Sequence, residues 1–230
     1  MKRFYRSAAV RTVAGGSGIA LDERPVRTPG GHELVVASPD LAEAIAAEWA
    51  AQADTIQPDA MPLTRFATTA TDLMPARRAD VVAETAGFGA TDLLSHRAAE
   101  PADLVLRQLA AWQPIVDWAA ARYDAPVAVV TGVTPARHPP AALDRLHDAV
   151  EAYADWPLLG LHAATTTLGS LLLALAMAEG RLDPKAAFEA SVLDETFEIE
   201  RWGEDPSAMA RRARAADEVR AAARFVALTR

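Results

Sequence analysis

The pattern of apolar side chains changes once along this chain, at Ser38, and that change constrains the fold more than any other feature. Before it, short apolar segments alternate with "AGGSG", "DERP" and "TPGGHE", which are rich in residues that reverse a chain. The apolar residues of these segments are Val10, Val13, Ile19, Leu21, Val26, Leu34, Val35 and Val36. The pattern is typical of strands joined by tight turns, so it predicts a small sheet of hairpins over residues 4–38.

After Ser38 a helical period takes over. The "SPD" at 38–40 is a helix start signal: a side-chain N-cap, a proline at the first helical position and an acid that complements the positive helix end. Leu41, Ile45 and Trp49 then recur every four residues, as on one face of a helix.

Several further helices are expected beyond this one. The same signals predict helices over 65–74, 75–88, 143–153, 163–179 and 184–202, and a last one from Asp205-Pro206 to Val226. An apolar face from Val105 to Tyr123 predicts another, with a kink or break at Pro114, because proline removes a helical hydrogen bond. The stretch at 126–133 fits a short strand or a loop. We therefore expect an α+β protein, with a small N-terminal β-hairpin sheet domain (residues 1–57, including its exit helix) followed by a larger, mostly α-helical domain (residues 58–230).

Composition limits the possible partners and compartments. A chain that is 51% hydrophobic can build a substantial core. Its formal net charge of −8 disfavours general binding to nucleic acid or to anionic lipid. The absence of cysteine excludes disulfides, thiolate metal ligands and a thiol nucleophile. The most apolar run, at 168–178, is well short of the roughly 20 residues that cross a bilayer, so no membrane insertion is expected.

Known catalytic and cofactor motifs do not fit this sequence. The "GGSG" at 15–18 precedes a strand instead of a helix, so it is interpreted as a hairpin turn and not as a dinucleotide site. The five histidines are scattered without ligand spacing, which predicts no metal site. Ser170 lies in a buried-helix pattern and lacks the turn of a nucleophile elbow, so it is assigned to helix packing. No cofactor and no catalytic residue are expected.

An acidic segment near the end of the chain, "ETFEIERWGED" at 195–205, places five carboxylates beside a tryptophan. If 184–202 is one helix, its buried stripe consists of Phe188, Val192, Thr196, Ile199 and Trp202. Asp194, Glu198 and Arg201 then form a solvated row on the opposite side. Glu195 falls inside the apolar arc, where an unpaired charge would be costly.

Two interpretations of Glu195 remain open at this point. It can form an internal salt bridge with Arg97 or another arginine, or it can border a groove and meet a cation of a partner. Glu200 lies at the edge of the stripe, and Trp202-Gly203 ends the helix. A hydrolase that uses Glu195 and Glu200 as acid and base is disfavoured, because five positions on a helix separate two side chains by about 140°.

Several segments, in chain order, carry a resemblance to a known family. They are "RFY", "LDERPVRTP", "LAEAIAAEWAAQADTIQPDAMPLTRFATTATD", "TDLLSHRA", "QPIVDWA", "LGSLLLALA" and "DETFEIERWGED". Together they resemble the assembly chaperones that bind the alpha subunit of the F-type ATP synthase head (the Atp-twelve family). The resemblance implies a non-enzymatic chaperone with a small β domain followed by a mostly helical one. Such a chaperone holds the unassembled alpha subunit, and shields its beta-facing surface from aggregation, until alpha pairs with beta.

The resemblance also suggests a site, a compartment and a partner. It points to Glu195, Glu200 and Trp202 of the acidic Trp-Gly motif as client-binding residues, whereas Trp49 of the Glu-Trp motif is expected to be structural. Family members work in mitochondria or in bacterial cytoplasm. This sequence uses arginine in preference to lysine and shows no transit peptide before "RFY", and both features favour the bacterial cytoplasm. The partner is then the alpha subunit, and the free protein is expected to be a monomer. The alternative is an acidic protein-interaction scaffold that docks another, basic client.

Overall fold

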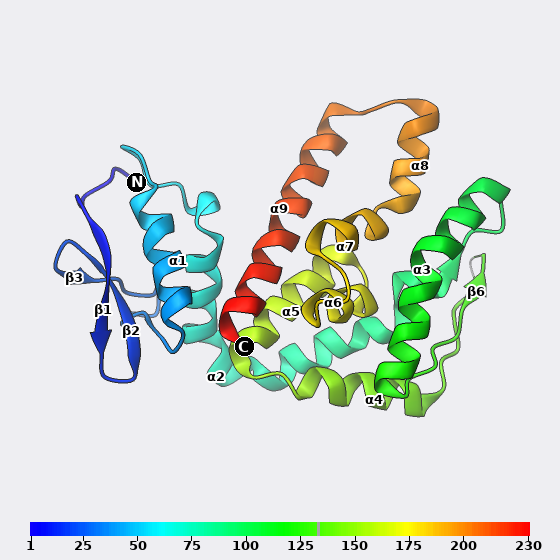
Figure 1. Ribbon diagram of the computed structural model, residues 1–230, viewed down its shortest axis with the longest axis horizontal. Helices are drawn as coiled ribbons and strands as arrows, with labels where there is room; N and C mark the ends of the chain where they lie inside the picture. Colours follow the sequence, from blue (N-terminus) through cyan, green and yellow to red (C-terminus); the bar gives the residue numbers. More distant parts are fainter. Residues whose placement is uncertain (133) are drawn as a thin grey trace. The chain divides into compact units, whose positions relative to one another are not determined.

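The computed structural model describes residues 1–132 and 134–230 (Figure 1). A small antiparallel sheet lies near the N-terminus and a largely helical region follows, which confirms the predicted α+β class. These residues form two compact units. The first contains Met1–Arg78, Asp155–Gly160 and Arg224–Arg230, and the second contains Ala79–Ala154 and Leu161–Ala223. The predicted boundary between residues 57 and 58 stays a prediction.

The sheet belongs to the first unit and is built from hairpins. Its strands are β1 (Ala8–Val13), β2 (Gly16–Leu21), β3 (Arg24–Pro25) and β4 (Val35–Val36). They are antiparallel in the order β1-β2-β3, and β4 also pairs with β2. Val13 pairs with Gly16, so Ala14-Gly15 is the turn of the β1–β2 hairpin, as the "GGSG" interpretation predicted. A Cβ atom on Gly16 would collide with the carbonyl oxygen of Val36, which explains the glycine there.

The first helix covers this sheet and starts where the sequence predicted. In α1 (Pro39–Ala50), the Ser38 hydroxyl accepts a hydrogen bond from the amide of Leu41 at 3.2 Å. Leu41 and Ile45 are buried, and α1 packs on β1 and β2 (Figure 1). The short helix η1 (Pro58–Ala60) leads to α2 (Pro62–Gly87). At the other end of the chain, the ring of Phe225 stacks on Phe66 at 5.1 Å and on Trp156 at 6.0 Å, which extends the core of this unit.

The remaining elements make up most of the second unit. They are η2 (Phe88–Thr91), η3 (Leu93–Ser95), β5 (His96–Arg97), α3 (Ala102–Tyr123), β6 (Val130–Thr131), α4 (Pro140–Glu151), α5 (Asp155–Leu168), α6 (Leu171–Ala178), α7 (Pro184–Ser191), α8 (Leu193–Trp202) and α9 (Pro206–Thr229). Helices α2, α5 and α9 contribute residues to both units. Every residue of α6 from Leu171 to Met177 is buried, so this helix is the centre of the second unit.

The stretch at 126–133 contains a short strand, since β6 pairs in parallel with β5. Its last residue, Val133, lies outside the described residues. Within the part of the chain that the structure describes, no helix combines the length and apolar character needed to cross a membrane.

Two helices continue through a proline, at Pro75 where a boundary was predicted and at Pro114 where a kink or a break was predicted. The separate helices expected over 65–74 and 75–88 are one helix, α2, with Pro75 inside it. Helix α3 likewise runs through Pro114 without a break. Both prolines are exposed, so water can bond to the carbonyl groups that each proline leaves free. Tertiary packing on both sides of the proline then outweighs the lost hydrogen bond.

Two predicted helices are instead divided. The helix expected over 163–179 is interrupted between α5 and α6, where Gly169 adopts a φ of 64° and Ser170 becomes the N-cap of α6. The helix expected over 184–202 is interrupted at Val192, whose φ of −109° and ψ of 22° separate α7 from α8. The second break changes which residues of the acidic segment are buried.

Candidate functional site

Helix α8 carries the acidic segment, and polar pairs fasten one of its flanks to α3. The pairs are Arg201 with Asp103 at 2.9 Å, Glu200 with Arg107 at 2.7 Å, and Asp194 with the Gln108 side-chain amide at 2.7 Å. The three pairs contact α8 near its start, at Asp194, and near its end, at Glu200 and Arg201. The rotation of α8 about its own axis is therefore well defined.

Phe197 is the apolar anchor of this contact. Only 4% of its surface is exposed, and the guanidinium groups of Arg201 and Arg107 lie 4.1 Å and 5.2 Å from its ring centroid. Cations over an aromatic face add to the stabilisation from burial. A continuous helix over 184–202 would turn Phe197 away from the predicted buried stripe. The helix instead breaks at Val192, and Phe197 is buried while Trp202 of the predicted stripe is exposed; the other four residues of that stripe are partly buried.

The other flank of α8 is fastened to α9 through Glu195. Its carboxylate lies 3.0 Å from the Arg212 guanidinium, which also donates to the Thr196 hydroxyl at 2.8 Å. Arg212 is mostly buried, with 17% of its side chain exposed, whereas Glu195 keeps 39% exposed. Glu195 thus forms an internal salt bridge, but with Arg212 and not with Arg97.

Arg97 has a different role in the second unit. Its guanidinium donates to the carbonyl oxygens of Leu94 at 2.9 Å and Gln108 at 3.0 Å, and it lies 5.3 Å from the Trp112 ring centroid. Burial lowers the pKa of Arg97. This side chain joins η3 and α3 and takes no part in holding the acidic segment.

Trp202 ends α8 and is exposed. It was predicted in the buried stripe, but 76% of its surface is accessible. Gly203, with a φ of 91°, turns the chain out of the helix, and Asp205 caps α9 by accepting from the amide of Ala208 at 2.7 Å. Among the described residues, Glu198 and Glu204 are exposed and have no ion-pair partner. The corner between α8 and α9 therefore displays an aromatic ring among carboxylates.

This arrangement is suited to binding and not to acid–base chemistry. Glu195 and Glu200 point to different neighbouring helices, and each holds an arginine. An acid and base pair needs two carboxyl groups that face one bond from opposite sides. The segment instead offers a fixed, exposed tryptophan and partly exposed ion pairs, which are common anchors in protein interfaces.

A buried acid, Asp92, supports the unit from within and was missed by the sequence reasoning. Its carboxylate accepts hydrogen bonds from the Ser170 hydroxyl at 2.7 Å and from the amides of Leu172 and Leu94 at 3.0 Å each. Burial raises the pKa of Asp92. The only sequence signal is an acid followed directly by apolar residues in "TDLLS". Ser170 is thus a helix cap and a partner of Asp92 as well as a packing residue.

One group of possible metal ligands occurs in the described residues. His147, Asp148 and Glu151 on α4 can bring one ligand atom each within 4.8 Å of one another. Residues three and four apart share a helix face, so this proximity follows from helix geometry alone. The sequence prediction of no metal site is neither strengthened nor overturned by it.

Comparison with known proteins places the chain in a family. The family model for the ATP12 chaperone protein matches residues 2–120. The crystal structure of Atp12 from Paracoccus denitrificans is 41% identical, with a TM-score of 0.95 over 100% of this chain and 98% of that chain. A mutant of the P. denitrificans protein with one Asp-to-Lys substitution matches at 41% identity and a TM-score of 0.94, over the same shares of both chains.

A third structure extends the comparison to another bacterium. The Atu1473 protein from Agrobacterium tumefaciens, a proposed chaperone, is 37% identical, with a TM-score of 0.95 over 100% of this chain and 86% of that chain. The family consists of assembly chaperones and not of enzymes. The chain therefore belongs to the ATP12 chaperone family, the assembly factors for the alpha subunit of ATP synthase.

Proposed function

We propose that this protein binds the unassembled alpha subunit of F-type ATP synthase and covers the surface that alpha later presents to beta. An orphan subunit exposes a large apolar interface, and such surfaces aggregate. A chaperone that covers this interface needs apolar anchors and charged groups for orientation. Family membership and the α8–α9 corner both support this function.

The observation that carries the proposal is the exposure of Trp202 on a helix that is held rigidly. The indole is 76% exposed, yet the preceding turns of α8 are fastened by ion pairs to α3 and to α9. Tryptophan is enriched among the residues that dominate binding energy. A side chain on an ordered helix also loses less conformational freedom when it binds than one on a mobile loop.

Glu195 and Glu200 are proposed to contact the client beside Trp202. Their side chains are 39% and 49% exposed although each already pairs with an arginine. A carboxylate has room for more than one donor, so each can accept a further cation from the client without losing its own arginine. Their internal pairs then orient them for that contact.

We further propose that the protein acts as a monomer in the bacterial cytoplasm, without a cofactor or nucleic acid. The homologous structures from P. denitrificans and A. tumefaciens come from bacteria, and the net charge of −8 opposes general binding to nucleic acid. Sedimentation of the purified protein tests the oligomeric state directly.

The decisive experiment mixes the purified protein with unassembled alpha subunit in the absence of ATP. Light scattering should stay low, and a complex should elute from a size-exclusion column. Trp202→Ala should raise the light scattering and reduce the amount of complex. The matched control is Leu73→Ala, which removes another exposed apolar side chain, 54% accessible, from α2 and should change neither measurement. Aggregation at the rate of alpha alone, with no complex, would contradict the proposal. Recovery of a different protein in a pull-down from native cells would favour the scaffold alternative.

A further inference from the structure

The exposed large apolar side chains of the described residues gather where α3 meets α8. Leu106 and Leu109 on α3 and Trp202 at the end of α8 are 64%, 51% and 76% exposed. These two helices pack against each other in the second unit (Figure 1). The remaining exposed large apolar side chains are Met1, Phe4, Leu73 and Val129. No other pair of contacting helices in the described residues carries three such side chains.

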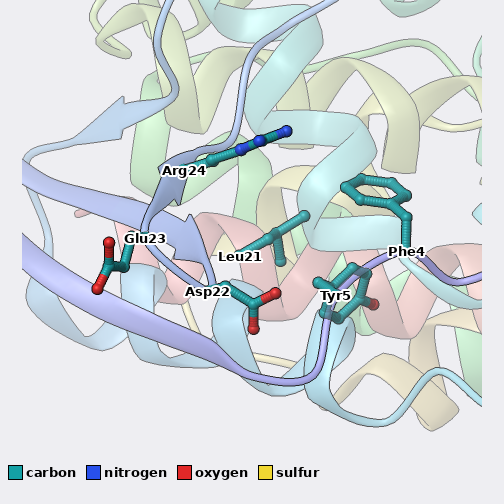
Figure 2. Close-up of a pocket in the computed structure, with 6 residues that line it drawn as sticks. All are labelled: Phe4, Tyr5, Leu21, Asp22, Glu23 and Arg24. Carbon is teal, nitrogen blue, oxygen red and sulfur yellow. The ribbon is translucent and has the colours of Figure 1, made fainter.

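A pocket in the first unit lacks this grouping. It has a volume of about 470 Å³ and lies at the end of β2 (Figure 2). It is lined by Phe4, Tyr5, Leu21, Asp22, Glu23 and Arg24. The amides of Ser7 and Arg6 donate to the Asp22 carboxylate and lower its pKa, so this acid stays ionised at neutral pH. One exposed ring among two carboxylates and one arginine does not define an occupant.

Leu106 and Leu109 form an apolar face on α3 that the core of the second unit does not use. They are three positions apart, so they lie on the same side of the helix. Ala102 and Ala110 are exposed on that side as well. Ile115 follows Leu106 by nine positions, which is half a turn around the helix, and it is only 3% exposed. The first half of α3 is thus apolar both toward the core and toward solvent.

An exposed ion pair joins this face to Trp202. Asp103 and Arg201 lie 2.9 Å apart, and their side chains keep 55% and 42% of their surface exposed. Asp103 lies one turn before Leu106, and Arg201 directly precedes Trp202. Because the pair itself is at the surface, it connects the two apolar groups. We call this surface the α3–α8 face: Ala102, Leu106, Leu109, Ala110 and Trp202.

The surroundings of the α3–α8 face are acidic. Helix α3 is balanced, with two Asp and two Arg. Of the elements that pack against it, α6 and η3 carry no charged residue, α4 has three acids against one arginine and one histidine, and α8 has four acids against one arginine. Glu204 and Asp205 follow α8 directly.

The cations that approach from other elements do not reverse this balance. Arg97 donates to carbonyl oxygens beneath α3, and Arg212 is held by Glu195. Arg211 and Arg214 lie about 100° and 160° around α9 from Arg212, the residue that contacts α8. Electrostatic complementarity therefore favours a partner that brings cations to the rim of this face.

We propose that the α3–α8 face is a docking surface for the alpha subunit, and that it takes an apolar patch of alpha with Lys or Arg at its rim. Apolar side chains of alpha pack on Leu106, Leu109 and Trp202. The cations pair with Glu198 and Glu204, which are exposed on either side of Trp202 in the sequence. An interface made for a permanent partner such as beta is apolar, as this surface requires. The inference rests on the proposed function, because it extends the contact of Trp202 along α3.

The test measures the affinity of labelled alpha subunit for the full-length protein by fluorescence anisotropy. Leu106→Ala and Leu109→Ala should each weaken binding by about tenfold, because each removes an apolar side chain that becomes buried in the complex. Ala110→Arg adds a bulky cation to the face without removing a native side chain, and it should weaken binding as well. Leu73→Ala makes the same change as the leucine variants at a 54% exposed position of the first unit and should leave the affinity unchanged.

Salt separates the apolar and the charged parts of the contact. Glu198→Lys and Glu204→Lys should weaken binding at low ionic strength, and their deficit should shrink as salt screens the exposed charges. The deficit of the leucine variants should persist in high salt. Glu43→Lys makes the same charge change at an exposed position on α1 and should leave the affinity unchanged. A deficit of equal size for Glu43→Lys would overturn the basic rim, because the effect would then follow net charge alone.

The possible results distinguish this inference from the proposed function. The leucine variants should keep the circular dichroism and thermal unfolding of the wild type, since both leucines are exposed and Ala favours helices. If Trp202→Ala weakens binding while the variants at 106, 109 and 110 bind like the wild type, α3 is not part of the docking surface and the proposed function stands. Should a leucine variant unfold, Ala110→Arg decides alone. Failure of the wild type to bind alpha would overturn the proposed function and this inference together.

Discussion

Asp92→Asn replaces one carboxylate oxygen by an NH₂ group at a fully buried position of the second unit. The carboxylate accepts from three donors: the hydroxyl of Ser170 and the amides of Leu94 and Leu172. An asparagine oxygen can still accept from Ser170 and Leu94. Its NH₂ group, however, would face the amide of Leu172, which places a donor against a donor at the start of α6.

The expected loss of stability follows from these contacts. A buried donor without an acceptor costs about 1–3 kcal/mol, and a hydrogen bond to a charged group contributes about 1.5–3 kcal/mol. Removal of a buried charge offsets part of this cost. We therefore expect the free energy of unfolding to fall by about 2 kcal/mol at neutral pH. The measurement is urea unfolding followed by tryptophan fluorescence and circular dichroism, with the exposed Asp144→Asn on α4 as the matched control.

The pH dependence of this loss gives a second, independent check. Burial raises the pKa of Asp92 in the folded state above its ordinary value of about 3.9. The folded protein then binds this proton more tightly than the unfolded chain, so the contribution of Asp92 is greatest at acid pH and declines as pH rises through the folded pKa. Asn does not titrate, so the stability difference between wild type and variant should be largest at acid pH and should shrink as the pH rises. A difference that grows with pH, or a variant as stable as the control, would refute this reasoning.

Three further predictions concern α8. Trp202→Ala should leave the free energy of unfolding within about 0.5 kcal/mol of the wild type, because the indole is mostly exposed. The same variant should bind the alpha subunit more weakly. Unfolding of the variant at a lower urea concentration than the wild type would contradict this prediction. Glu195→Lys should weaken binding of the alpha subunit and lower stability modestly by placing two cations together. The double variant with Arg212→Glu should recover stability, and a calorimetric double-mutant cycle would measure that coupling. Phe197→Ala should cost about 3 kcal/mol of stability by calorimetry, and a cost near zero would mean that α8 is not packed on α3 as described.

Local signals in the sequence were sufficient wherever neighbouring residues determine the backbone. The start of α1 at Ser38-Pro39, the hairpin turn at Gly15 and the cap of α9 at Asp205 all depend on residues within a few positions of each other. The α+β class follows from the change of apolar period at Ser38, and the family resemblance rests on the order of several such segments. These features are confirmed by the structure and the comparisons.

Only the tertiary structure determined how the acidic segment is presented. The break at Val192 sets the phase of α8, and it buries Phe197 and exposes Trp202, although a continuous helix would have done the opposite. Arg212, 17 positions from Glu195, becomes its partner only because α9 returns alongside α8. Asp92 and Ser170 are 78 positions apart in the sequence, and they likewise meet only because the segments that carry them pack together. Periodicity describes one helix at a time, whereas breaks and long-range pairs depend on packing between helices, which no local pattern records.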